Sequence, residues 1–166
     1  MSLKIDSVSV LVLDDHRFMQ QVMRLILNGL GVRKVVCVAS VDEALTVLST
    51  ETFDIVIADY LLGGKTGAQF TRLARTTRSG GDRFIPIIAC TADTTPKTIQ
   101  ELRDAGADEI LGKPVSPQAI WSKITAVVNA RRRFVSTPEF FGPDRRRRNV
   151  ESPAGERRAS DQEIVL

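Results

Sequence analysis

The chain has 166 residues, of which 43% are hydrophobic and 26% are charged, so it can form a single hydrophobic core. No apolar run approaches the ~20 residues that a membrane span requires, and the start MSLKIDSVSV lacks the long apolar stretch of a secretory signal. We therefore expect a cytoplasmic protein. Cys37 and Cys90 lie in apolar stretches without metal-ligand spacing, which indicates core thiols rather than a disulfide or a zinc site.

The formal net charge of +3 is distributed unevenly along the chain. Residues 1–130 carry equal numbers of basic and acidic residues, whereas residues 131–166 carry nine arginines and six acidic residues. This second segment mixes Pro, Gly, Ser and charge without a sustained apolar period. We predict a folded domain over 1–130 and an Arg-rich, largely disordered tail over 131–166, which we expect to be dispensable for folding.

Five short apolar runs in the first 130 residues predict β-strands. Their Val, Ile and Leu residues are nearly continuous rather than strictly alternating, which is typical of parallel strands that are buried on both faces. The predicted strands span 8–13, 34–39, 54–58, 84–90 and 108–111.

Helix-start signals fall between these strands. A hydroxyl residue with capping-box spacing, or directly before a proline, marks four helix starts, at Ser40, Thr66, Thr95 and Ser116. Gly31 and Gly106 suit helix ends. With another helix starting near Arg17, five strands alternate with five helices. Because crossovers between parallel strands are right-handed, we predict an α/β fold of the (βα)5 type, a doubly wound parallel sheet in a three-layer sandwich.

Charged and hydroxyl residues follow four of the predicted strands. Asp14 and Asp15 end the first strand, Asp59 the third, Thr91 the fourth and Lys113 the fifth. Each alone could be a helix cap, a loop hydroxyl or a solvated lysine, but together they meet at the rim where such sheets bind ligands. Three neighbouring carboxylates would repel one another unless a cation compensated. Oxygen-only ligands favour Mg²⁺ over zinc, and a lysine ammonium can hold a phosphate oxygen.

Four motifs occur in a characteristic order: LDDH after the first strand, then ADYLLGGKTG, ACTA and LGKP. With them, residues 5–130 resemble the receiver domain of two-component response regulators, the CheY-like fold. The resemblance implies the sheet order 2-1-3-4-5. It also implies that Asp59 accepts a phosphoryl group from a histidine kinase or a histidine phosphotransfer protein. Thr91 and Lys113 would contact that phosphoryl group.

The resemblance further implies a Mg²⁺ site. Asp15 and Asp59 would bind the ion directly together with the backbone carbonyl of Leu61, and Asp14 would act through water. A protein of this kind is not an enzyme toward other substrates, because it catalyses only its own phosphorylation and dephosphorylation.

The sequence departs from the family pattern at the residues that usually report phosphorylation. Ile110 stands where an aromatic residue is usual, and a β-branched aliphatic side chain cannot perform a ring rotation between core and solvent. Leu62-Gly63-Gly64 replaces the frequent Met-Pro in the loop after Asp59. We therefore expect the switch to run through Thr91 and the loop 92–95.

The favoured function is a phosphorylation-controlled module that binds an unidentified protein through its fourth helix, fifth strand and fifth helix. One alternative is an adaptor that acts independently of phosphorylation. Another uses DRRRR, residues 144–148, to bind nucleic acid or a different acidic surface, although nucleic acid is not the partner we expect. The aromatic residues of the tail either anchor an interface or pack on the domain; they are Phe134, Phe140 and Phe141.

Overall fold

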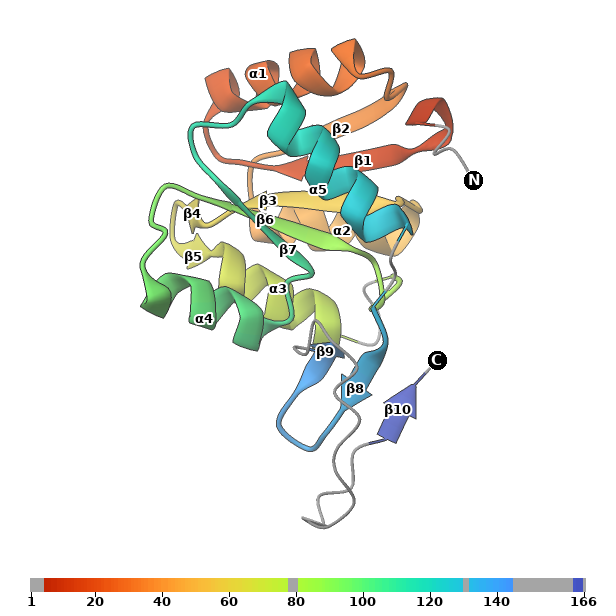
Figure 1. Ribbon diagram of the computed structural model, residues 1–166, viewed down its shortest axis with the longest axis vertical. Coiled ribbons are helices and arrows are strands. Elements are labelled where there is room, and N and C mark those ends of the chain that lie inside the picture. Colours follow the sequence, from red (N-terminus) through yellow and green to blue (C-terminus); the bar gives the residue numbers. More distant parts are fainter. Residues whose placement is uncertain (1–4, 78–80, 130–131, 145–162, 166) are drawn as a thin grey trace.

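The structure, a computed structural model, describes residues 5–77, 81–129, 132–144 and 163–165. Its centre is a five-stranded parallel sheet in the order β2-β1-β3-β6-β7 (Figure 1). These strands are β1 (Ser9–Leu13), β2 (Lys34–Val38), β3 (Ile55–Asp59), β6 (Ile87–Thr91) and β7 (Glu109–Gly112). The predicted order 2-1-3-4-5 is confirmed. The numbering differs because an unpredicted hairpin, β4 (Leu61–Leu62) with β5 (Lys65–Thr66), turns at Gly63 and Gly64.

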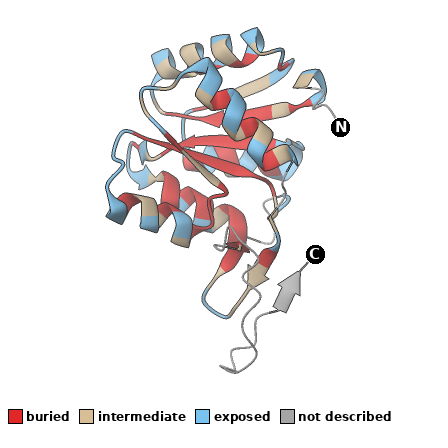
Figure 2. Ribbon diagram, viewed as in Figure 1, coloured by how far each residue is buried: buried red, intermediate tan, exposed pale blue. Residues whose placement is uncertain are grey.

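Helices cover both faces of the sheet, as the three-layer prediction requires. They are α1 (Arg17–Gly29), α2 (Val41–Thr50), α3 (Gly67–Thr76), α4 (Pro96–Ala105) and α5 (Pro117–Asn129), preceded by the 3-10 helix Ile5–Ser7. Val10 and Val12 of β1 pack in a cluster with α1 and α5, whereas Leu11 and Leu13 pack with α2 and α3. Figure 2 shows the resulting burial of the central strands. Alternate side chains thus enter two cores, which explains the continuous apolar runs.

The predicted helix starts and ends are confirmed by their hydrogen bonds. Hydroxyl caps are present at Ser40, Thr66, Thr95 and Ser116. At Thr66 the capping box is complete, because Gln69 also accepts a hydrogen bond from the Thr66 backbone N–H at 2.8 Å. At Ser40 the Glu43 carboxylate accepts instead from the Ala39 N–H. Gly106 ends α4 with φ of 102°, a left-handed conformation that glycine adopts without strain.

Strand β6 begins later than predicted. The apolar run predicted a strand from residue 84, but the strand begins at Ile87 because Pro86 has no backbone N–H to donate to a neighbour. The carbonyls of Arg83 and Ile85, ahead of the strand, accept hydrogen bonds from the side chain of Arg75 instead.

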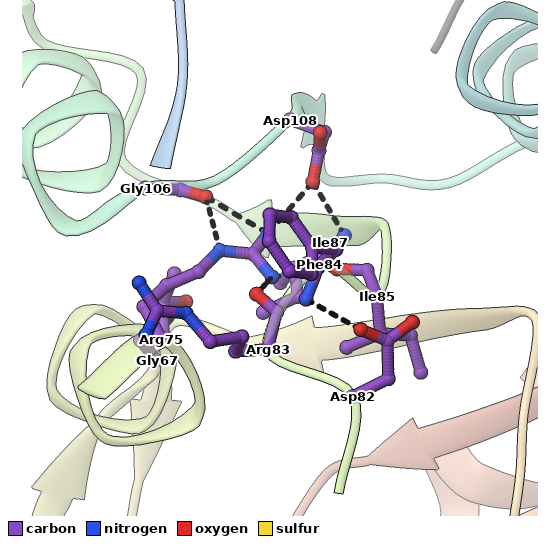
Figure 3. Close-up of polar contacts among 10 residues, drawn as sticks. Gly67, Arg75, Asp82, Arg83, Phe84, Ile85, Ile87, Gly106 and Asp108 are labelled. Atoms are coloured by element: carbon purple, nitrogen blue, oxygen red, sulfur yellow. Dashed lines mark hydrogen bonds and ion pairs between the residues drawn. The ribbon is translucent and has the colours of Figure 1, made fainter. Parts of the chain in front are cut away.

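Arg75, near the end of α3, is only 1% exposed and uses its guanidinium to bond four residues from two other segments of the chain (Figure 3). It donates to the carbonyls of Arg83, Ile85 and Gly106 at 2.7–3.1 Å and to the Asp108 carboxylate at 2.8 Å. Burial lowers the pKa of Arg75 and raises the pKa of Asp108, while the attraction between the two opposes both effects. Removing either partner would leave an uncompensated buried charge.

Part of the predicted tail is ordered. The strand β8 (Phe134–Ser136) pairs antiparallel with β9 (Phe141–Pro143) and with β10 (Glu163–Val165), in the order β10-β8-β9. The composition of the segment, with its many charges, predicted disorder, but its phenylalanines supply enough apolar surface to hold 132–144 on the domain. The remaining residues of the predicted tail lie outside the described part of the chain; they are residue 131, residues 145–162 with the arginine run, and residue 166.

The hairpin of β8 and β9, residues 134–143, packs through its aromatic rings. Phe134 and Phe141 meet the ring of Phe84 edge-on, at centroid distances of 5.0 and 5.2 Å. The Arg75 guanidinium lies 5.1 Å from the centroid of Phe134, and the Arg83 guanidinium 3.3 Å from that of Phe141. Of the two alternatives for these aromatic residues, packing on the domain therefore holds for Phe134 and Phe141.

Phe141→Ala should lower the free energy of unfolding by about 3 kcal/mol, because it removes a buried ring that contacts two others. Urea denaturation followed by circular dichroism measures the change. The control is Glu139→Ala, an exposed position of the same hairpin, which should have almost no effect.

Removal of residues 131–166 should also destabilise the domain, and equal stability of the truncated chain would show that the segment is dispensable for folding.

Candidate functional site

The acidic residues meet because three of them lie at the ends of neighbouring strands. Asp14 and Asp15 follow β1, and Asp59 is the last residue of β3. In the parallel register Leu13 is opposite Ala58, so Asp14 lies level with Asp59. Both carboxylates are in residues only 6% exposed, which is unusual for acidic side chains. The backbone N–H of Asp14 donates to the Val38 carbonyl at 3.1 Å and fixes this residue in place.

Helix α3 begins directly against the backbone of Asp59. A Cβ atom placed on Gly67 would lie 2.4 Å from the Asp59 carbonyl oxygen, which no side chain can tolerate. The Gly67 N–H also donates to the Tyr60 carbonyl at 2.8 Å. Gly67 therefore allows the helix and the end of β3 to pack without a gap.

Lys113 brings a positive charge to the carboxylates from the end of β7. Its Nζ lies 2.9 Å from Asp59 Oδ1 and 3.7 Å from Asp14 Oδ2. Its backbone N–H donates to the Thr91 carbonyl at 2.8 Å, which fixes the base of the side chain. Burial alone lowers the pKa of Lys113, but the hydrogen bond to Asp59 and the charges of Asp59 and Asp14 raise it overall. Lys113 is therefore a cation at neutral pH.

Burial dominates the electrostatics of Asp59. It raises the pKa of this carboxyl group, while the hydrogen bond and charge of Lys113 lower it and the charge of Asp14 raises it again. The nearby thiol of Cys90 is also buried, which raises its pKa to about 12 and keeps it protonated and inert. Cys90 and the half-buried Cys37 are both free, as expected from their spacing, although Cys37 is less buried than a core thiol.

The donor set of the cluster fits a hard divalent cation. One possible ligand atom from each of Asp14, Asp15, His16 and Asp59 lies within 4.8 Å of all the others. Asp15 Oδ2 accepts a hydrogen bond from the Gly63 N–H at 2.9 Å. Asp15 Oδ1 is buried without an aligned hydrogen-bond donor, even though His16 Nδ1 lies 2.8 Å away. A buried carboxylate oxygen without a donor is suited to bind a metal ion such as Mg²⁺.

Thr91 and Leu61 are less closely tied to the carboxylates than the other predicted residues. Thr91 ends β6 and is 1% exposed, but its hydroxyl bonds with the backbone of Asp93, accepting from the N–H at 3.0 Å and donating to the carbonyl at 3.1 Å. Leu61 starts β4 two residues after Asp59. Its carbonyl as a metal ligand and the contact of Thr91 with a phosphoryl group stay predictions.

The side chain next to Asp59 makes a contact that the sequence motifs do not predict. The Tyr60 hydroxyl donates to the Glu101 carboxylate of α4 at 2.8 Å, and Tyr60 and Ile110 both pack against the same small cluster of buried residues. One signal was available in the sequence, because an aromatic residue follows Asp59 while an aliphatic one occupies position 110. The contact with α4 was not visible in the sequence, because that contact depends on how α4 packs in the folded protein.

Comparison with known proteins gives one consistent result. A family model described as the response regulator receiver domain matches residues 10–125, and this match ends before β8. The chain is 33% identical over 112 residues to the sensory/regulatory protein RpfC of Xanthomonas campestris pv. campestris, covering 68% of this chain and 15% of that protein. It is 28% identical over 119 residues to the phosphate regulon transcriptional regulatory protein PhoB of Klebsiella pneumoniae, covering 72% and 51%. The chain therefore spans at most about half the length of these relatives.

Solved structures of similar fold cover most of the sheet and its helices. The receiver domain of the sensor histidine kinase PA1611 of Pseudomonas aeruginosa PAO1 has 26% identity and a TM-score of 0.66, covering 74% of this chain and 98% of that one. Its structure has a magnesium ion coordinated in the active site cleft. The chemotaxis protein CheY4 of Vibrio cholerae has 29% identity and a TM-score of 0.66, covering 72% and 98%. Within the described ranges, this chain has no helix long and apolar enough to cross a membrane.

The raised pKa of Asp59 predicts a pH-dependent stability. Because the folded protein binds this proton more tightly than the unfolded chain, the free energy of unfolding falls as pH rises from about 4 through the folded pKa. Asp59→Asn should remove this fall and stabilise the fold at neutral pH without divalent cations. Urea denaturation across a pH series tests this, with Asp42→Asn at an exposed ion pair as the control. A less stable Asp59→Asn protein would mean that the attraction between Asp59 and Lys113 stabilises the fold by more than the burial of the Asp59 charge destabilises it.

Proposed function

Since the chain belongs to the response regulator receiver domain family, we propose that Asp59 accepts a phosphoryl group from the phosphohistidine of a histidine kinase or histidine phosphotransfer protein. Receiver domains are generally signalling modules rather than enzymes, and they interact with such kinases and phosphotransfer proteins. The observation that carries the proposal is a buried carboxylate at the rim of the sheet, paired with Lys113 and flanked by two further carboxylates.

In the proposed reaction an Asp59 carboxylate oxygen attacks the phosphorus in line with the bond to the donor imidazole. The new O–P bond forms as the P–N bond breaks, and the imidazole nitrogen keeps the electron pair and takes up a proton. Lys113 Nζ, already 2.9 Å from Asp59 Oδ1, can donate to a phosphoryl oxygen and offset its developing charge. The product is an acyl phosphate, which water can hydrolyse to reset the site.

We assign the proposed Mg²⁺ to Asp15 and Asp59 with the Leu61 carbonyl, and we assign Asp14 to contact through water. A bound Mg²⁺ neutralises the carboxylates and the phosphoryl oxygens. The oxygen of Asp15 that lacks an aligned donor supports this assignment. The three carboxylates exceed the single ammonium of Lys113, so the site has an excess of negative charge that a divalent cation would offset.

A small acyl phosphate should phosphorylate the protein in the presence of Mg²⁺ and fail to do so when the metal is chelated. Asp59→Asn should abolish labelling, and Lys113→Ala should slow it by about 100-fold because one donor to the developing charge is lost. Phosphate-affinity electrophoresis measures the product, and Asp42→Asn is the matched carboxylate control. Labelling that persists in Asp59→Asn would contradict the assignment. Absence of labelling in the wild-type protein would instead favour a phosphorylation-independent adaptor.

We place the docking of the phosphohistidine donor on α1, which begins immediately after the acidic residues. Phe18 is 72% exposed and Leu25 is 75% exposed, and their spacing of two helical turns puts them on one face. Large apolar side chains on a surface next to a reactive site commonly anchor a partner. A donor histidine has to approach Asp59 from this open rim, so the adjoining helix face is suited to hold the donor protein.

Phe18→Ala with Leu25→Ala should slow transfer from a phosphorylated histidine phosphotransfer domain by about tenfold or more, because interface anchors are lost. The same variant should react normally with a small acyl phosphate, which needs no docking surface. Rapid-mixing measurement of phosphorylated protein compares the two donors. Trp121→Ala, on the exposed side of α5, is the control, and an equal loss in both variants would remove α1 from the proposal.

The downstream protein is proposed to bind at the face formed by α4, β7 and α5. A pocket of about 240 Å³ opens there, with Ile99 and Ile110 among its apolar lining residues. Its basic lining residues are Arg103, Lys123 and Arg132, and its acidic ones are Asp108 and Glu109. Because Asp108 is already neutralised by Arg75, the excess of positive charge favours an acidic segment of the partner.

A further inference from the structure

Polar contacts connect the end of β6 with the first turns of α4. The Thr91 hydroxyl bonds with both the N–H and the carbonyl of Asp93, at 3.0 and 3.1 Å. The Asp93 carboxylate in turn accepts from the Thr95 N–H at 2.9 Å and from the Thr98 hydroxyl at 2.5 Å. These bonds lower the pKa of Asp93, with the Thr98 bond as the largest cause. The start of α4 is therefore held by a turn that itself depends on Thr91.

Tyr60 reaches the same helix from the other side. Its hydroxyl donates to Glu101 at 2.8 Å, and this bond is the main reason that the pKa of Tyr60 is raised. Glu101 lies three residues after Thr98 on α4, and the Thr98 hydroxyl is held by Asp93. The turn at Asp93 and the Tyr60 hydroxyl therefore hold the same helix at positions about one turn apart.

Hydrogen bonds fix the main chain of Tyr60 at the end of β3. A change in the contact between Tyr60 and α4 therefore reflects movement of the helix rather than movement of β3. The Tyr60 N–H donates to the Cys90 carbonyl at 2.7 Å, and its carbonyl accepts from the Gly67 N–H at 2.8 Å. Its ring packs with Ile110 on a cluster of small buried residues and one leucine, namely Ala68, Ala89, Leu102, Ala105 and Ala107. Ile110, which packs against the same cluster, has an aliphatic side chain without a polar tip.

A phosphoryl group on Asp59 would disturb this arrangement through the single proton of the Thr91 hydroxyl. That proton is donated to the Asp93 carbonyl in the structure. A hydroxyl has one proton to donate, so Thr91 can bond a phosphoryl oxygen only by giving up the Asp93 carbonyl. The turn that caps α4 then loses one of its fixed contacts.

We propose that Tyr60 couples the state of Asp59 to helix α4, by holding Glu101 in the unphosphorylated protein and releasing it when Thr91 turns to the phosphoryl group. This inference rests on the proposed function. Tyr60 is a positioning residue, because it touches neither the phosphoryl group nor the metal. Release of Glu101 shifts the first turns of α4, and Thr94 and Ile99 from this region line the pocket proposed for the downstream protein.

The single tyrosine of the chain makes the coupling directly measurable. A ¹³C label at the ζ carbon of the tyrosine ring gives one NMR signal, recorded with Mg²⁺ before and after addition of beryllofluoride as a phosphoryl mimic. We expect the ring signal and the backbone amides of residues 97–102 to shift together. Tyr60→Phe keeps the ring but removes the hydroxyl, so the mimic should still shift the amides around Asp59 while the response of α4 is largely lost.

Glu101→Gln removes the charged acceptor without touching the ring, and it should reduce the response of α4 in the same way. It also decides the outcome if Tyr60→Phe does not fold. The control is Gln100→Ala, because this neighbouring side chain donates along α4 to Asp104 at 2.8 Å, away from Tyr60, and its loss should leave the response unchanged.

Different results would contradict the coupling through Tyr60 and the phosphorylation of Asp59. If the mimic shifts the amides of Thr91 and Lys113 but leaves the Tyr60 ring signal unmoved, the coupling is overturned and the proposed phosphorylation stands. An undiminished response of α4 in both Tyr60→Phe and Glu101→Gln overturns it equally. If the mimic shifts none of the amides around Asp59, the proposed phosphorylation fails and the coupling fails with it.

Discussion

The burial of a carboxylate at the end of the central strand is the constraint on which the site depends. Asp59 ends β3, which has β1 on one side and β6 on the other, so little water reaches its charge. Such a charge requires compensation by an opposite charge, and Lys113, directly after β7 and two strands away, supplies it. The compensation is incomplete, because Asp14 and Asp15 add negative charge at the same rim. The incomplete balance leaves the site able to exchange one ionic partner for another.

Arg75 is a second buried charge, near the amino ends of β6 and β7. Unlike Asp59, it has all of its charge compensated and its donors paired. Arg75 uses its guanidinium donors on carbonyls and on Asp108, and aromatic rings from the β8–β9 hairpin cover it. A fully satisfied polar network makes a structure rigid, whereas a partly satisfied one leaves it ready to bind. The same fold therefore holds one saturated ionic centre that fastens the carboxy-terminal segment and one unsaturated centre that can react.

Local chemistry explains what the sequence could predict. The caps at Ser40 and Thr66 depend on residues three apart, and the acidic rim follows from the rule that parallel strands end at one edge. The hairpin was missed because Phe134 and Phe141 are held by Phe84, about fifty residues earlier in the chain, and a charged composition conceals such contacts. For Thr91 the position could be predicted but the orientation of the hydroxyl could not, because it depends on the turn at Asp93.

The contact between Gly67 and the Asp59 carbonyl fixes one side of the site. Because backbone meets backbone there, α3 can neither approach nor yield, and it acts as a fixed wall beside the carboxylate. The segment from Ala92 to Thr95, which follows the neighbouring strand β6, is exposed instead. The carboxylate of Asp59 therefore lies between a helix start that is fixed in place and an exposed turn. The absence of a side chain at Gly67 is what makes the first of these two sides so close.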